Sequence, residues 1–127
     1  MEYINILGRI LFGGYFIYSG YHHFRFMKMM VGYSQSKKIP LANIAVPVTG
    51  LMLIAGGLSY LLDFHVTLGS LILIAFLLPT SFLMHNFWAI EDPMQKMGEN
   101  VNFNKNIALI GALILFISVR HLAGAIL

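Results

Sequence analysis

The sequence predicts an all-α membrane protein, a bundle of four transmembrane helices running up-down-up-down. Two features of composition support this: the chain of 127 residues is 58% hydrophobic, and only 10% of its residues are charged. A soluble domain carries roughly 25% charged residues. One span needs about 20 mainly apolar residues, so the chain has room for four spans with short links, which we expect to form a single domain over residues 1–127.

Composition also excludes several kinds of chemistry. The chain has no cysteine, which removes disulfides, thiolate catalysis, iron–sulfur clusters and CxxC redox motifs. Its net charge of +3 is small, and the basic residues lie in the expected loops. There they set topology and contact anionic lipid headgroups, and we expect no nucleic-acid binding. The first apolar segment lacks the basic start and the A-x-A cleavage site of a signal peptide, so we expect it to remain as a helix.

The first helix is expected over residues 4–24, with Arg9 well inside the apolar span. An arginine at the centre of a span costs about 2.5–3.5 kcal/mol unless it snorkels or pairs. Fourteen residues make nearly four helical turns, so Arg9 and His23 share a face. The residues between them on that face are Gly13, Phe16 and Gly20. Because small residues allow close helix approach, this face should turn to the bundle, so that His23 looks inward and His22 looks away.

Residues 25–41 form the first connection, in which methionines and aromatic residues alternate with Arg25 and Lys28. This pattern fits a short helix lying in the membrane interface. The second helix is expected over 41–62, where Pro47 invites a kink. A stripe of small residues seven apart indicates a packing face: Asn43, Gly50 and Gly57.

The third helix is expected over residues 66–90 and ends before Pro93. Its last turns place His85, Trp88 and Asp92 at positions i, i+3 and i+7, which share one helix face.

The fourth helix is expected over residues 104–122. Asn106 and Arg120 are fourteen residues apart and therefore share a face. Four spans put the loops at 25–41 and 91–103 on one side of the membrane. Six basic residues belong to that side: Arg25, Lys28, Lys37, Lys38, Lys96 and Lys105. The positive-inside rule then predicts cytoplasmic loops, outside termini and a location in the cell membrane, the inner membrane of a two-membrane cell.

A shift of 63 residues superposes two pairs of tripeptides at helix ends: His22-His23-Phe24 on His85-Asn86-Phe87, and Asn43-Ile44-Ala45 on Asn106-Ile107-Ala108. Together with the matching hydropathy, this favours a duplicated helical hairpin. In such a repeat His22 corresponds to His85, whereas the helix face that carries Arg9 favours His23. Both histidines therefore stay under consideration.

Three segments carry a family resemblance: Gly8 to Gly13 leading to Ser19-Gly20, His85-x-Phe87-Trp88 followed by Asp92-Pro93, and Phe103-x-Lys105-Asn106 continuing to Gly111. In their order and spacing the chain resembles the DoxX family of small four-helix membrane proteins. Two positions depart from the usual pattern. The family commonly has a lysine where His23 stands, and a glycine, in Gly-x-Pro before the second helix, where Lys38 stands.

The resemblance implies the fold more firmly than the function. The family takes its name from a membrane subunit of a thiosulfate:quinone oxidoreductase, and some members are linked to quinone or oxidative-stress handling. It therefore implies a multi-pass membrane protein with a quinone among its expected ligands.

One functional hypothesis is a quinone-binding subunit of a membrane oxidoreductase. Its candidate residues are His85, Asp92 and Arg9 for catalysis and His23, His85, Trp88 and Asn106 for holding the quinone. His85 would donate to one carbonyl and relay protons, Asp92 would orient its imidazole, and Trp88 would stack on the ring. Arg9 or His23 would serve the other carbonyl. Electrons would come from a partner subunit or a bound donor, because the sequence has no cysteine and no flavin or nicotinamide fingerprint.

Two other hypotheses stay open. In a non-enzymatic scaffold, assembly factor or small-solute transporter, His85, Asp92 and Asn106 would cap helix ends and hydrogen-bond between helices. A metal or haem site would need His22 or His23 together with His85 and Asp92. We assign none of the candidate site residues as a metal ligand. The glycine stripes leave surfaces for a homodimer or a larger complex.

Overall fold

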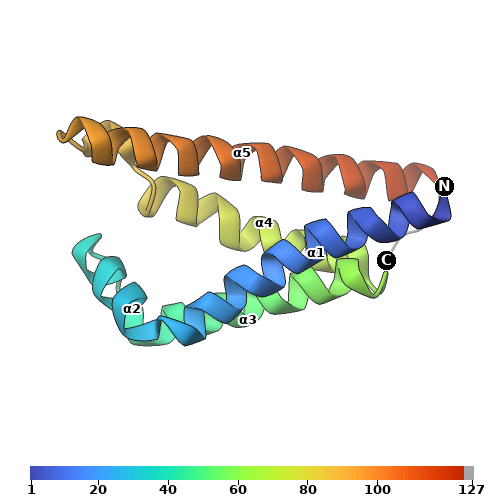
Figure 1. Ribbon diagram of the computed structural model, residues 1–127, viewed down its shortest axis with the longest axis horizontal. Helices are drawn as coiled ribbons and strands as arrows, with labels where there is room; N and C mark the ends of the chain where they lie inside the picture. Colours follow the sequence, from blue (N-terminus) through green and yellow to red (C-terminus); the bar gives the residue numbers. More distant parts are fainter. Residues whose placement is uncertain (125–127) are drawn as a thin grey trace.

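The computed structural model describes residues 1–124, and all of its regular elements there are helices. In chain order they are α1 (Glu2–Arg25), α2 (Met27–Ser36), α3 (Ala42–Leu61), α4 (Val66–Leu83), the short 3₁₀ turn η1 (Phe87–Ala89) and α5 (Pro93–Leu122). The long helices alternate in direction, and α2 turns away from the shared end of α1 and α3 (Figure 1). The connection 25–41 thus contains the short helix that its pattern predicts.

Three helical segments are long and apolar enough to cross a membrane: Ala42–Leu61, Val66–Ala89 and Pro93–Leu122. Their mean hydropathies are 1.8, 2.1 and 1.5. The chain is therefore an all-helical, multi-pass membrane protein. Helix α1 has 24 residues but carries Glu2 and Arg9, and it is not one of the three. A fourth span stays a prediction.

Helix α1 packs against α3 through paired glycines. A Cβ atom added at Gly13 would lie 2.6 Å from the carbonyl oxygen of Gly57, and one added at Gly20 would lie 2.6 Å from that of Gly50. No side chain fits at such separations, so the two backbones approach as closely as glycine allows. The buried residues of α1 are Gly13, Phe16, Gly20 and His23, which confirms the face predicted for this helix.

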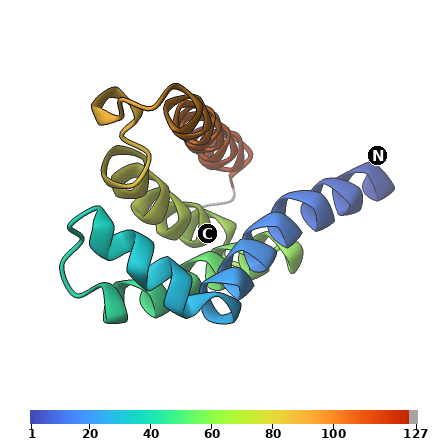
Figure 2. The same cartoon turned by 60° about the vertical axis from the view of Figure 1, so that its left-hand side comes forward.

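The packing order of the long helices is α1 on α3, α3 on α4, and α4 on α5. The core side chains are Phe16, Leu53, Tyr60, Val66, Leu73, Leu77 and Leu113. Within residues 1–124, the backbones of α1 and α5 are not in contact, and Figure 2 shows the two ribbons apart from each other. Side chains bridge them instead: the rings of Phe12 and Phe116 have centroids 5.4 Å apart.

The helix predicted over 66–90 is shorter than expected, because α4 ends at Leu83. The backbone then leaves the α-helical hydrogen-bond pattern, and the chain reverses through η1 toward α5. As a result His85, Trp88 and Asp92 do not share a helix face. The one-face arrangement predicted for these three residues is wrong.

The predicted loop 91–103 is mostly helix, because α5 begins at Pro93 and not near residue 104. The Asp92 carboxylate accepts a hydrogen bond from the backbone N–H of Gln95 at 2.9 Å, which is the geometry of an N-cap. Proline suits the first helical position because the backbone N–H that it lacks would have no hydrogen-bond partner within the helix there. Pro93 therefore starts a helix where the sequence analysis expected it to end one.

The residues paired by the 63-residue shift differ in environment. Asn43 is exposed, whereas Asn106 is buried, with 4% of its surface accessible. Of the two adjacent histidines, His23 is buried, at the end of the bundle where His85 lies, and His22 is not. The duplicated hairpin stays a prediction, and its register does not give these pairs matching surroundings.

Candidate functional site

Two cavities lie at the end of the bundle where α2 sits. The larger, of about 310 Å³, lies among α1, α2, α3 and α4 and has a mainly apolar lining. The smaller, of about 150 Å³, lies among α1, α3, α4 and α5. Four residues border both cavities: His23, Phe76, Thr80 and His85. The larger volume is at the lower end of the range for small-molecule sites and is enough for one aromatic ring.

His23 is held from the α3 side by acceptors. Its Nδ1 lies 3.0 Å from the carbonyl oxygen of Val46 and 3.1 Å from the Thr49 hydroxyl. The Thr49 hydroxyl itself lies 2.7 Å from the carbonyl oxygen of Ala45 and donates there. Since a carbonyl cannot donate, Nδ1 carries the hydrogen, and the neutral ring keeps a bare Nε2. Within residues 1–124, Nε2 of His23 has no hydrogen-bond partner.

His85 is held in the same way by a carboxylate. Its Nδ1 lies 2.5 Å from Oε2 of Glu99, a side chain that is only 12% exposed. The Tyr33 hydroxyl donates to the other carboxylate oxygen of Glu99 and lies 3.3 Å from the carbonyl oxygen of Met84. The cluster joins α2, the end of α4 and α5. For the described chain, Nε2 of His85 is also without a hydrogen-bond partner.

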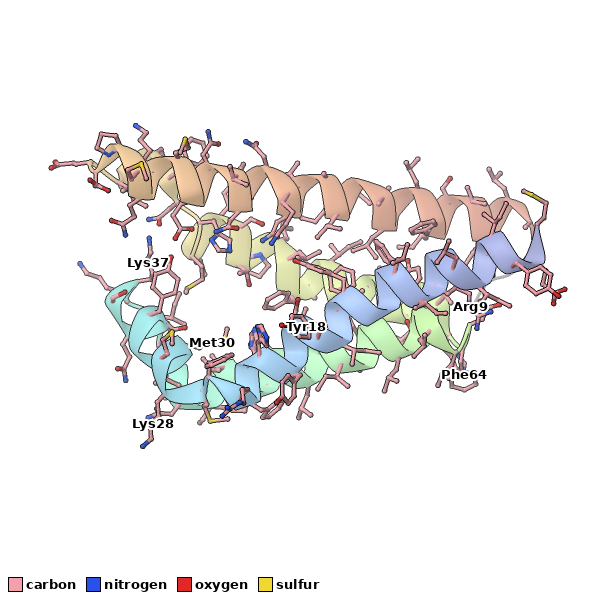
Figure 3. The ribbon with its side chains drawn as sticks, in the orientation of Figure 1. Arg9, Tyr18, Lys28, Met30, Lys37 and Phe64 are labelled. Carbon is pink, nitrogen blue, oxygen red and sulfur yellow. The ribbon has the colours of Figure 1, made fainter. Side chains whose placement is uncertain are left out.

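A second contact ties α2 to the same place. Lys37, at the end of α2, donates from Nζ to Oδ1 of Asn86 at 2.7 Å. Figure 3 shows Lys37 at the end of the molecule opposite to Arg9, with the side chain rising from α2 toward α5. Tyr33 and Lys37 together fasten α2 over the larger cavity through polar contacts.

Burial raises the pKa of the Tyr33 hydroxyl above its ordinary value, and the hydrogen bond to Glu99 and the negative charge of that carboxylate raise it further. The hydroxyl therefore stays protonated at any physiological pH. It acts as a fixed donor to Glu99 and leaves the carboxylate to accept from His85.

The smaller cavity is more polar. Ser19, Lys105 and Asn106 border it together with the two histidines. Asn106 is buried, and Lys105 places its Nζ 5.7 Å from the ring centroid of Tyr15, a cation–π distance. The structure thus brings three of the predicted site residues, His23, His85 and Asn106, to one cavity.

Comparison with known proteins identifies the family. A family model described as DoxX matches residues 4–86, which is more than half of the chain. The chain belongs to the DoxX family. No curated protein and no solved structure matches it. The part of this DoxX chain that the family model matches contains His23 and His85 but ends before Glu99.

Arg9 lies away from both cavities of the DoxX chain. Its Nε donates to the carbonyl oxygen of Tyr60 at 3.1 Å, and its Nη2 donates to that of Leu61 at 2.7 Å. These are carbonyls at the end of α3, which have no partner within their own helix. The geometry gives Arg9 a capping role and does not bring it to His85.

Trp88 and Asp92 also border neither cavity of this DoxX protein. Trp88 is 52% exposed and packs edge-on against Phe103, with ring centroids 5.6 Å apart. Asp92 caps α5, so the carboxylate bonded to His85 belongs to Glu99. The role predicted for Asp92 therefore falls to a residue that sequence reasoning placed in a loop.

Sequence reasoning missed Glu99 and Tyr33, although a signal for Glu99 existed. Glu99, Asn106 and Leu113 recur every seven residues, and the side chains of all three are at most 12% exposed. Had α5 been extended back to Pro93, Glu99 would have fallen on the buried face. For Tyr33 the sequence holds no such signal, because its partner is 66 residues away.

The metal hypothesis needed His22 or His23 beside His85 and Asp92. Within residues 1–124 of the DoxX chain, no three His, Cys, Asp or Glu side chains gather in a way that could hold a metal ion. His22 instead lies against aromatic rings, with centroids 4.2 Å from Tyr18 and 5.2 Å from Phe26.

Proposed function

We propose that this DoxX protein binds the ring of a quinone within the membrane, in the cavities bordered by His23 and His85. One observation carries the proposal. Within residues 1–124, one imidazole on α1 and one in the connection after α4 border the same mainly apolar cavity, and each has its Nδ1 engaged and its Nε2 without a hydrogen-bond partner. Ionisable side chains at membrane depth are by default candidate functional groups.

The chemistry of the ligand matches this lining. A quinone ring is flat and apolar and carries oxygens on opposite edges, so it needs apolar walls and two polar contacts. Phe76 borders both cavities and packs near His23, with ring centroids 5.8 Å apart. Few precisely placed polar groups in an apolar pocket are typical of small-molecule sites.

In this proposal the protein is the quinone-interacting subunit of a membrane oxidoreductase. His85 exchanges protons with the ligand, as imidazoles do near neutral pH, and Asn106 and His23 complete the polar contacts. Electrons reach the ring from a partner subunit. The proposal assigns Arg9, Trp88 and Asp92 no contact with the quinone.

The membrane arrangement belongs to the same proposal. Helix α1 supplies a fourth span of the cell membrane, and both termini lie outside. Five basic residues support a cytoplasmic position for the cavity end, since all lie on α2, its flanks or the first turns of α5: Arg25, Lys28, Lys37, Lys38 and Lys96.

The test uses protein purified in mild detergent. Bound quinone is assayed by solvent extraction, and short-chain ubiquinone and menaquinone analogues are titrated by calorimetry. We expect saturable binding that weakens at least tenfold in both His23→Ala and His85→Ala. His22→Ala is the matched control, because His22 neighbours His23 on α1 but borders neither cavity, and its affinity should equal that of the wild type.

Two results would count against the proposal. One is the lack of saturable binding in the wild type. The other is an equal loss of affinity in His22→Ala. Either result would favour the non-enzymatic scaffold, assembly factor or small-solute transporter.

A further inference from the structure

We propose that the cavity is built for the reduced, hydroxyl-bearing form of the ring, a hydroquinone, in preference to the oxidised, carbonyl-bearing form, and that Glu99 sets this preference. The inference rests on the proposed function, because it concerns the same cavity. It follows from which nitrogen of each imidazole carries the hydrogen.

The first imidazole presents an acceptor. Both neighbours of Nδ1 of His23 are oxygens that accept: the Val46 carbonyl, which has no hydrogen, and the Thr49 hydroxyl, whose hydrogen is used on Ala45. Nδ1 must therefore be the N–H nitrogen. The neutral ring then offers only the lone pair of Nε2 to a ligand.

The second imidazole presents an acceptor for the same reason. The oxygen next to Nδ1 of His85 belongs to Glu99, whose other oxygen accepts from Tyr33. A carboxylate that receives two donated hydrogen bonds is stabilised in its ionised form, which accepts only. Nδ1 of His85 therefore carries the hydrogen, and Nε2 is left as a second bare nitrogen.

Two acceptors that border one cavity suit a ligand with two donors. A hydroquinone donates one O–H to each Nε2, whereas a quinone would place its carbonyl lone pairs against those of the two rings. The hydroxyls of Tyr33 and Thr49 border the larger cavity but already donate to Glu99 and Ala45, so they offer a quinone no hydrogen. The hydroxyls of Ser34 and Thr80 also border it; because a hydroxyl can donate or accept, they serve either form of the ring, and the two imidazoles set the difference. A ligand that leaves buried polar groups unpaired is rejected strongly.

The titratable and charged groups around His85 come from three helices: Glu99 and Lys105 of α5, Tyr33 and Lys37 of α2 and its end, and His23 of α1. The experiment is therefore run at one fixed, mildly alkaline pH, so that the protonation of these groups is the same for both ligands. Dissociation constants of a short-chain ubiquinol and the matching ubiquinone are measured under argon in detergent. We expect the wild type to bind the ubiquinol roughly tenfold more tightly or better.

Glu99→Gln is the decisive variant. The amide oxygen can still accept from Tyr33, while the amide NH₂ faces Nδ1 of His85, so the ring hydrogen moves to Nε2. The ubiquinol-to-ubiquinone preference should fall about tenfold. Asp92→Asn is the matched control, because this carboxylate caps the same helix away from both cavities, and its preference should be that of the wild type.

A second measurement needs no ligand. In protein labelled with ¹⁵N-histidine, nitrogen shifts report which ring nitrogen carries hydrogen, and His85→Ala assigns the signal. We expect Nδ1–H at His85 in the wild type and Nε2–H in Glu99→Gln. A wild-type His85 with hydrogen on Nε2 would overturn the proposal, even if the variant did not fold.

The outcomes separate the two proposals. Equal affinity of the wild type for both forms, or an unchanged preference in Glu99→Gln, would refute the preference for hydroquinone and leave the quinone site standing. Binding of neither form would refute the proposed function, and the preference with it.

Discussion

The two ends of the molecule use their ionisable side chains in different ways. At the turn end, defined by Arg9, Arg120 and the α3–α4 turn around Asp63, each cation contacts a helix terminus or an opposite charge. Arg9 donates to two carbonyls at the end of α3, and Nη1 of Arg120 lies 3.1 Å from Oδ1 of Asp63. At the cavity end, defined by His23, His85 and the Tyr33–Glu99 contact, each imidazole has an engaged Nδ1 and, among the described residues, no partner for Nε2.

The difference shows what separates a structural polar group from a candidate site in a membrane protein. Arg9 and His23 lie on one helix and share a face, yet Arg9 satisfies backbone oxygens and borders neither of the two cavities described above. His23 satisfies one oxygen and then borders two cavities. Burial and charge alone do not distinguish them; the unused hydrogen-bonding atom beside empty space does.

Arg9→Ala should break the turn end most severely. It removes two charge-assisted hydrogen bonds and leaves the carbonyls of Tyr60 and Leu61 without this donor, so we expect a loss of about 2–4 kcal/mol in the free energy of unfolding. Titration with SDS in mild detergent, followed by circular dichroism, measures it. Quinone affinity should be unchanged in the folded fraction. A loss of affinity without a loss of stability would instead mean that Arg9 takes part in quinone binding.

Tyr33→Phe should have an intermediate effect at the cavity end. It removes the donor to Glu99 and should lower stability at pH 7 by about 1–2 kcal/mol. Because the pKa of Tyr33 is raised from 10.0 in the folded state, its contribution is complete below pH 10 and is lost as the pH rises above 10. Wild type should therefore lose stability relative to Tyr33→Phe between pH 10 and 11. If the stability advantage of the wild type over Tyr33→Phe instead grew as the pH rose, the raised pKa would be contradicted.

Asp63→Asn should have the smallest effect. The pair with Arg120 is accessible to solvent, with the Asp63 side chain 50% exposed, and exposed pairs contribute about 0–1 kcal/mol. Asparagine also tolerates the left-handed backbone that Asp63 adopts, with φ of 52°. We expect a change below 1 kcal/mol in the same SDS titration and none in quinone affinity. A loss above 2 kcal/mol would mean that the turn end depends on this pair.

Helical periodicity predicted much of the fold. The spacing of Gly13, Phe16, Gly20 and His23 identified the buried face of α1, because a regular helix repeats its faces every seven residues or so. It also marked Asn106, which is buried on α5. Family membership, inferred from three segments, is confirmed over residues 4–86.

The error at Pro93 explains most of what was missed. Asp-Pro marks the end of one helix or the start of the next, and the choice depends on whether the aspartate finds the N–H of Gln95. Reading Pro93 as the end of a helix hid residues 93–103 of α5, and Glu99 with them. The Tyr33–Glu99 contact could not be predicted from the sequence, because only the docking of α2 brings the two side chains together.

The length of α5 has a consequence for the acidity that the cavity end experiences. Thirty residues make a helix of about 45 Å, against a hydrocarbon core of about 30 Å. Glu99 lies 21 residues before Arg120, or about 32 Å along the axis, so with Arg120 at one membrane surface the carboxylate reaches the other. An anionic leaflet with a surface potential of about −30 mV concentrates protons there roughly threefold over bulk water. The lipid composition of the membrane would thus adjust the proton supply to Glu99 and His85 without any change in the bulk medium.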